Sequence, residues 1–180
     1  MALSGPLWQR AASFAAHAHR GQIRKDDRTP YFAHCVRVAM TVRDVFGCAD
    51  QVAIASAFLH DTIEDTTTDF DDLAERFGVE VATCVAALTK NPTMPEHVRE
   101  PAYDAGLAAA SWQARLIKLA DVYDNFHDAV ETWGPTKIPG KNFERAARAL
   151  GLAEAGEKDA AGCVERAMGL VRAMVEGARR

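Results

Sequence analysis

The stretch that decides the fold reads Ala57-Phe58-Leu59-His60-Asp61-Thr62-Ile63-Glu64-Asp65-Thr66. It continues an apolar run that begins at Val52, so four polar side chains arrive at the end of a segment typical of a buried helix. Three carboxylates lie beside one imidazole within six residues, and at a partly buried site they repel one another unless a cation or bound protons neutralise them. The stretch therefore predicts a metal ion, and spare carboxylates beside a metal indicate hydrolysis.

Helical spacing brings these polar side chains to one side of a predicted helix over residues of about 49–64. His60 and Glu64 are four residues apart, as are Asp61 and Asp65. Residues four apart are neighbours on a helix surface, so all four side chains are expected to share one face.

Two polar residues elsewhere in the chain extend this group. Asp121 lies in a predicted helix over about 111–130 and is flanked by apolar residues, so it faces inward and needs a partner, either Lys118 or a metal. His34 lies one turn into a predicted helix over about 30–46, and taken alone it is typical of a hydrogen-bonded structural histidine. The candidate metal ligands are His34, His60, Asp61 and Asp121. Two imidazoles with two carboxylates suit Mn²⁺, Fe²⁺ or Zn²⁺ with water in the remaining positions.

Apolar residues recur at helical spacing through the rest of the chain, and no segment alternates with period two. The expected helices cover residues of about 5–19, 30–46, 49–64, 69–77, 79–89, 111–130 and 142–178, the last bent near Gly156. We expect loops at 22–29, 91–101 and 133–140, the second because it contains Pro92, Pro95 and Pro101. The sequence predicts an all-α protein with a single domain over residues 1–180.

Composition excludes several classes of function. The 180 residues are 48% hydrophobic and 26% charged, with a formal net charge of −4, so we expect no binding to nucleic acid. No apolar run approaches the ~20 residues that span a bilayer, and Gln9 and Arg10 interrupt any signal-peptide pattern, so we expect no membrane association. The four cysteines form no Cys-x-x-Cys pair, which favours reduced thiols and a cytoplasmic location.

A local concentration of positive charge near the N-terminus runs against the net charge. Its members are Arg20, Arg24, Lys25 and Arg28. Two interpretations remain open, a solvated basic loop and a site for a small phosphorylated ligand.

The motifs together resemble one known family. His34, then His60-Asp61, then Asp121 match the H…HD…D pattern of the HD phosphohydrolase superfamily. The chain is most similar to the hydrolase domain of RelA/SpoT-type stringent-response enzymes in its stand-alone form, the small alarmone hydrolases that include the metazoan SpoT homologues. The further matching stretches are Ala15-Ala16-His17-Ala18-His19-Arg20-Gly21-Gln22-Ile23-Arg24-Lys25, Thr29-Pro30-Tyr31 up to His34, Leu59 through Thr66, Phe77-Gly78, Leu88-Thr89-Lys90 and Lys118-Leu119-Ala120-Asp121 through Asn125. They cover about residues 8–128 in order.

This resemblance implies an all-helical fold, one Mn²⁺ ion, and removal of the 3′-pyrophosphate from guanosine tetra- and pentaphosphate. It implies that His34, His60, Asp61 and Asp121 are the metal ligands. It also implies that Glu64 and Asp65 are the catalytic pair, that Arg24 and Lys25 lie beside the base, and that Asn125 lies beside the ribose and phosphates.

The sequence departs from the family pattern at two places. Cys35 follows His34 where the family usually has proline, and the match fades after about residue 130, where Lys141-Asn142-Phe143 replaces a tyrosine-containing helix. The substrate therefore stays open between guanosine alarmones and another nucleotide, such as adenosine alarmones or the 2′-phosphate of NADPH. A non-catalytic nucleotide-sensing module is expected to have lost metal ligands, and this chain retains all four. With 180 residues we expect no synthetase domain and hydrolysis as the sole activity.

Overall fold

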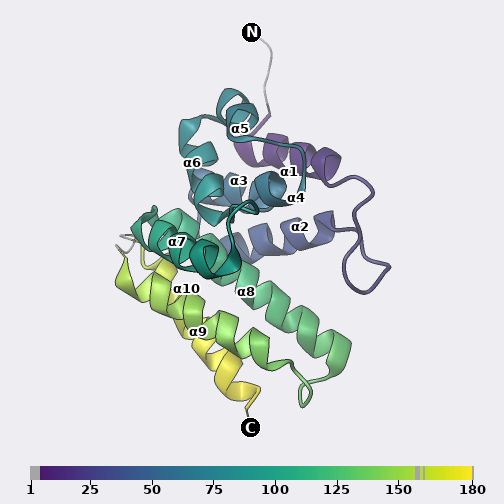
Figure 1. Cartoon of the computed structure of the whole chain (residues 1–180), viewed down its shortest axis with the longest axis vertical. Helices are drawn as coiled ribbons and strands as arrows, with labels where there is room; N and C mark the ends of the chain where they lie inside the picture. The colour runs from purple at the N-terminus through teal and green to yellow at the C-terminus, as the bar shows by residue number, and fades with distance from the viewer. Residues whose placement is uncertain (1–4, 157–158, 160, 180) are drawn as a thin grey trace.

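Helices form nearly all the regular structure of the computed structural model, which describes residues 5–156, 159 and 161–179 (Figure 1). The helices are α1 (Leu7–Ala18), α2 (Phe32–Met40), α3 (Gln51–Leu59), α4 (Thr62–Asp65), α5 (Phe70–Phe77), α6 (Val79–Leu88), α7 (Glu96–Ala109), α8 (Trp112–Trp133), α9 (Gly140–Ala155) and α10 (Cys163–Gly177), with a π-helical turn, η1 (Thr41–Val45), after α2. Within the described ranges the only extended pairing is an isolated antiparallel bridge between Ile23 and Pro30. The predicted all-α class is confirmed.

Helix α3 lies at the centre of the first half of the chain. Asp50 caps its N-terminus by accepting a hydrogen bond of 2.7 Å from the backbone N–H of Ala53. Every residue from 53 to 59 is buried, because α3 contacts α1, α2, α6 and α8. A helix that is apolar all round must be enclosed by other elements, and here those elements deliver the polar residues at its C-terminal end to the interior.

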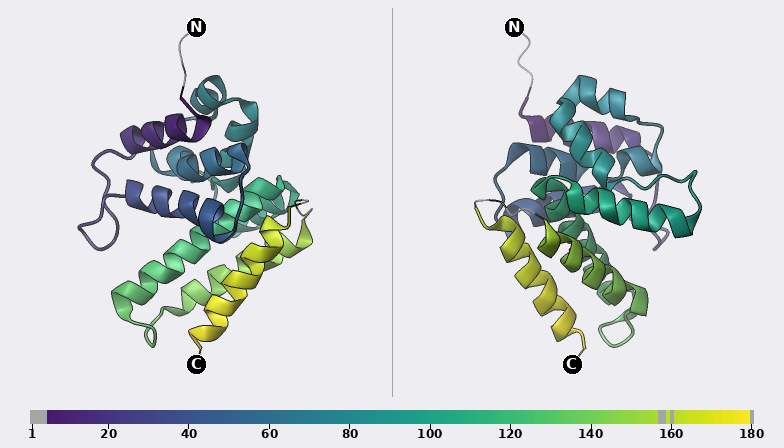
Figure 2. Two further views of the ribbon diagram at one scale, coloured as in Figure 1. Left: turned by 180° about the vertical axis from the view of Figure 1, so that it is seen from behind. Right: turned by 60° about the vertical axis from the view of Figure 1, so that its left-hand side comes forward.

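The C-terminal half forms a second group of helices. Helices α8, α9 and α10 run beside one another, and α7 lies across them next to the first group (Figure 2). Helix α8 contacts α2 and α3 as well as α9 and α10, so it joins the two groups. Helix α9 ends at Ala155 and α10 begins at Cys163, in agreement with the break expected near Gly156.

The structure interrupts the helix expected over 49–64. Helix α3 ends at Leu59, Asp61 has φ −102° and ψ 0°, and α4 restarts at Thr62. The hydroxyl of Thr62 donates to the carbonyl of Leu59 at 2.7 Å, and His60 Nδ1 lies 2.9 Å from the carbonyl of Ala57. Side-chain hydrogen bonds of this kind compete with the helical ladder, so the polar residues themselves end the helix.

The expectation of a loop over 91–101 is wrong for its second half. Helix α7 begins at Glu96 directly after Pro95, where the missing N–H of proline leaves no helical hydrogen bond unmade. Pro101 lies inside the helix and costs about 3 kcal/mol there. Burial of Tyr103 and Leu107 against neighbouring helices offsets that cost. The prolines alone therefore predicted a loop where tertiary packing stabilises a helix.

All four cysteines are free and buried. Among the described residues, no helix combines the length and the apolar character needed to cross a membrane.

Candidate active site

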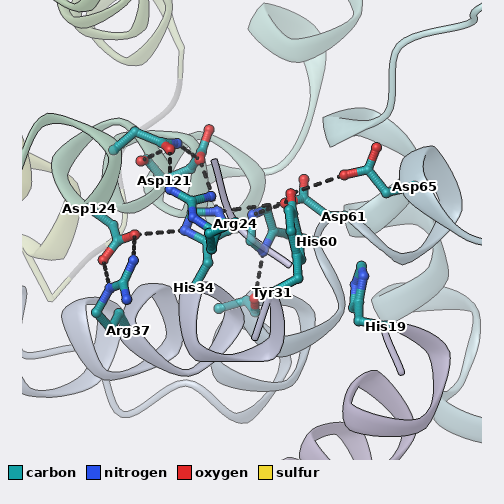
Figure 3. Close-up of polar contacts among 12 residues, drawn as sticks. His19, Arg24, Tyr31, His34, Arg37, His60, Asp61, Asp65, Asp121 and Asp124 are labelled. Carbon is teal, nitrogen blue, oxygen red and sulfur yellow. Dashed lines mark hydrogen bonds and ion pairs between the residues drawn. The ribbon is translucent and has the colours of Figure 1, made fainter. Parts of the chain in front are cut away.

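Two histidines and two aspartates from three parts of the chain meet at one point (Figure 3). His34 Nε2 lies 3.5 Å from Asp61 Oδ2 and 3.4 Å from Asp121 Oδ1, and His60 Nε2 lies 3.0 Å from Asp61 Oδ2. Potential ligand atoms of His34, His60 and Asp121 all lie within 4.8 Å of one another. The break after α3 turns Asp61 toward the two imidazoles. Helix α2 supplies His34 and helix α8 supplies Asp121.

The donor atoms of this group suit a cation. His60 is 3% exposed, and its buried Nε2 faces Asp61 Oδ2 without making a hydrogen bond of normal geometry. Burial lowers the pKa of His34 and of His60, but the surrounding aspartates raise it more, so both values are above the usual range. For Asp121 the signs are reversed. Burial raises the pKa of this carboxyl group, but Lys118 and the histidines hold it well below its usual range. The group therefore attracts positive charge, and these side chains fit a divalent metal ion.

Asp124 orients His34 from behind, a role that the sequence did not predict. Its Oδ2 lies 2.7 Å from His34 Nδ1, and it accepts hydrogen bonds from Arg37 Nε at 2.5 Å and Nη2 at 3.0 Å. A carboxylate on one imidazole nitrogen fixes the ring and leaves the other nitrogen free for a metal. The available signal was spacing, because Asp124 follows Asp121 by three residues and so shares its helix face.

The two acids of α4 lie next to this group and are held in different ways. Asp65 Oδ2 accepts a hydrogen bond of 3.0 Å from the hydroxyl of Tyr31, whose oxygen also lies 2.7 Å from Asp61 Oδ2. Glu64 Oε2 accepts a hydrogen bond of 2.9 Å from the backbone N–H of Lys90. Burial raises the pKa of Glu64 above its usual value. Tyr31 is a second residue whose role at the site the sequence did not predict, although it belongs to a family motif.

The expected substrate-binding residues border the same space. Arg24 Nη2 donates to Asn125 Oδ1 at 2.9 Å and to Asp128 Oδ2 at 2.8 Å, and its guanidinium carbon lies 5.7 Å from the centre of the Tyr31 ring. Asn125 Nδ2 in turn donates to the backbone oxygen of Asp121 at 3.0 Å and to its carboxylate. Arg24 is thus connected through Asn125 to a candidate metal ligand. Lys25 lines the same cavity.

All the expected site residues line one cavity of about 470 Å³, a size typical of small-molecule sites, whereas Arg37, Asp124 and Asp128 lie behind its lining. We call one part of its lining the histidine–carboxylate cluster, which consists of His34, His60, Asp61, Glu64, Asp65 and Asp121. A second part, the basic cluster, consists of Lys90, Tyr103, Lys118, Arg145 and Arg148. The cavity therefore combines potential metal ligands and acids with cationic side chains, as hydrolysis of a phosphate ester requires.

Comparisons with known proteins agree with this geometry. A family model described as HD domain matches residues 11–135, a range that contains all four candidate metal ligands. The guanosine-3′,5′-bis(diphosphate) 3′-pyrophosphohydrolase MESH1 of Mus musculus is 40% identical over 119 residues, which are 66% of this chain and 66% of the mouse protein. The human MESH1 protein is 37% identical over 145 residues, covering 78% of this chain and 80% of that protein.

A solved structure extends the similarity to most of the chain. It is described as a metazoan ortholog of SpoT that hydrolyses ppGpp and plays a role in starvation responses. It aligns with a TM-score of 0.75 and 26% sequence identity, covering 95% of this chain and 96% of its own.

Proposed function

The chain belongs to the HD domain family, and we propose that it is a metal-dependent hydrolase that removes the 3′-pyrophosphate from guanosine 3′,5′-bis(diphosphate) and the corresponding pentaphosphate. The products would be GDP or GTP and pyrophosphate. The observation that carries the proposal is the histidine–carboxylate cluster, which places four metal-ligand candidates and two further acids in one nucleotide-sized cavity. The names of the mouse and human relatives support the choice of substrate.

We assign the metal site to His34, His60, Asp61 and Asp121. The buried Nε2 of His60, which faces Asp61, and the position of His34 Nε2 between two aspartates support this assignment. Mn²⁺ is the proposed ion, with Fe²⁺ and Zn²⁺ compatible with the same donors. When bound, the ion supplies Lewis acidity to the phosphoryl group and lowers the pKa of water.

Glu64 and Asp65 would activate and orient the attacking water. Burial makes Glu64 a stronger base than a free carboxylate, and the Lys90 N–H fixes its position. The hydroxyl of Tyr31 holds Asp65 in place. The water oxygen attacks the phosphorus bonded to the ribose 3′-oxygen and gives a proton to a carboxylate. The bond between that phosphorus and the 3′-oxygen breaks, the carboxyl group returns its proton to the 3′-oxygen, and pyrophosphate and the nucleotide are released.

Arg24, Lys25 and Asn125 would bind the nucleotide. Their place on the cavity lining supports this role. A planar guanidinium stacks on a purine as readily as it binds a phosphate, and Arg24 is held in place by Asn125 and Asp128. The free, buried cysteines support a cytoplasmic location, and the net charge of −4 supports a small nucleotide rather than nucleic acid as the ligand.

The proposal is tested by incubating the purified chain with Mn²⁺ and guanosine tetraphosphate and separating the products by ion-exchange chromatography. We expect GDP and pyrophosphate in equal amounts, and none when the divalent ion is chelated. Parallel reactions contain adenosine tetraphosphate or NADPH. Turnover of either one without turnover of the guanosine compound would contradict the assigned substrate.

A further inference from the structure

The basic cluster contains groups that the proposed reaction does not use. Lys90 follows α6, Tyr103 lies on α7, Lys118 on α8 and Arg148 on α9, and all four line the cavity. Lys118 connects them to the histidine–carboxylate cluster, because its Nζ lies 2.9 Å from Asp121 Oδ2. The basic cluster is therefore continuous with the candidate metal site.

Three cations surround one tyrosine ring. Lys90 Nζ lies 5.2 Å from the centre of the Tyr103 ring, and Lys118 Nζ and the guanidinium carbon of Arg148 each lie 5.9 Å from it. Such contacts with an aromatic face are favourable individually. Three like charges around one ring nevertheless repel one another, so the arrangement needs neighbouring anions to hold it.

Two carboxylates supply part of that negative charge from outside the cavity. Glu100 accepts hydrogen bonds of 2.9 Å from Lys90 Nζ on both oxygens and one of 2.6 Å from Arg148 Nη1. Asp104 accepts one of 2.6 Å from Arg148 Nε. Glu100 and Asp104 do not belong to the cavity lining. They therefore hold the two cations in place without occupying the space in front of them.

The hydroxyl of Tyr103 requires an acceptor that the described residues do not provide. Tyr103 is 8% exposed, and its buried hydroxyl donates to no acceptor among them. Burial raises the pKa of this phenol, so it remains a donor at neutral pH. The cations around its ring have donors and no acceptors, so none can take the phenolic proton. An anion that enters the cavity can accept a hydrogen bond from the phenol and approach the cations at the same time.

We propose that Lys90, Tyr103 and Arg148 form a phosphate-binding subsite beside the histidine–carboxylate cluster, for a phosphate group of the substrate that does not react. The identity of the substrate rests on the proposed function, whereas the affinity for phosphate rests on these contacts. Two groups of the substrate have the required chemistry. One is the distal phosphate of the 3′-pyrophosphate, and the other is the 5′-diphosphate.

Calorimetric titration of the full chain with inorganic pyrophosphate and with GDP, in the presence of a metal chelator, tests the subsite without requiring turnover. The variants are Tyr103→Phe and Lys90→Gln. Their matched controls are Tyr123→Phe, whose ring packs on Phe46 and His127 outside the cavity, and Lys137→Gln in the loop after α8. We expect each cavity variant to weaken binding by about tenfold, as for loss of one hydrogen bond to a charged group, while the controls bind like the wild type.

The two ligands separate the two sources of phosphate. Weaker binding of GDP assigns the subsite to the 5′-diphosphate, and weaker binding of pyrophosphate alone assigns it to the distal 3′-phosphate. Unchanged affinity for both ligands in both variants overturns the subsite even if the chain hydrolyses guanosine tetraphosphate, and so does failure of the wild type to bind either anion. Selective loss of binding in a chain without hydrolase activity would support the subsite and refute the proposed function.

Discussion

The two clusters of the cavity differ in how the chain builds them. In the histidine–carboxylate cluster, four of the six residues lie within 60–65, and hydrogen bonds from neighbouring groups fix the side chains. The basic cluster collects residues from the segment after α6 and from α7, α8 and α9, and carboxylates behind it hold its cations. The two proposals together assign the chemistry to the first cluster and the binding of a substrate phosphate to the second. Substitutions should therefore affect turnover and metal binding in one cluster, and affinity in the other.

Loss of a candidate metal ligand should have the largest effect. We expect His60→Ala to abolish bound metal and to lower kcat/KM by at least about 1,000-fold, because metal Lewis acidity contributes several kcal/mol to transition-state stabilisation. Metal content by mass spectrometry and steady-state kinetics measure both quantities. His97→Ala, which removes an exposed imidazole on α7, serves as the control. Full metal content in His60→Ala would remove this residue from the ligand set.

The two acids of α4 should separate catalysis from metal binding. We expect Glu64→Gln with Asp65→Asn to keep the metal and to lower kcat by about 100-fold to 1,000-fold, as for loss of a general base. The same two measurements apply. Loss of metal in this double variant would show that one of the acids is a ligand rather than a base.

Removal of the carboxylate behind His34 should have an intermediate effect. Asp124→Asn is expected to weaken metal binding by about 10-fold to 100-fold, the usual effect of losing a residue that orients a metal-binding histidine. Competition with a metal indicator gives the dissociation constant, and Asp71→Asn on the exposed side of α5 is the control. If Asp124→Asn binds the metal ion as tightly as the wild type does, α2 alone orients His34.

Loss of the Glu100 carboxylate, which holds Lys90 and Arg148 in place, should have the smallest effect, and this effect is on stability. Hydrogen bonds from Lys90 and Arg148 lower the pKa of Glu100 from 4.5 to about 2 in the folded chain. A lowered folded-state pKa stabilises the fold above the unfolded value of 4.5 and loses that contribution as the pH falls toward 2. Because Glu100 is partly exposed, we expect Glu100→Gln to lower the free energy of unfolding by only about 1 kcal/mol at pH 7.

Urea denaturation of both proteins at several pH values measures this difference. It should shrink as the pH falls below 4.5, because the wild-type carboxylate then becomes protonated in the unfolded chain and next in the folded one. A difference that stays constant between pH 7 and pH 3 would contradict the assigned role of the ion pairs.

The contrast between the clusters also explains what could be read from the sequence. Helical periodicity predicts the all-α fold, and close spacing brings His60, Asp61, Glu64 and Asp65 together before any tertiary contact is known. The end of α3 at Leu59 was not predictable from periodicity, because local hydrogen bonds of His60 and Thr62 stop a helix whose apolar pattern continues.

Contacts between distant segments account for the rest. Tyr31 and Asp124 acquire their roles only when α2 meets α4 and α8. The basic cluster needs α7, which the prolines obscured and which tertiary packing stabilises. Lys90, Tyr103 and Arg148 share no motif or period, so only the fold reveals that they meet. The assigned roles of the site residues remain predictions for the experiments above.

Hydrolysis of guanosine tetraphosphate in ¹⁸O-enriched water tests the central claim most directly. If water attacks the phosphorus next to the ribose, mass spectrometry will find one ¹⁸O atom in the released pyrophosphate and none in GDP. Label in the nucleotide product, release of inorganic phosphate instead of pyrophosphate, or no reaction in the presence of Mn²⁺ would contradict the account.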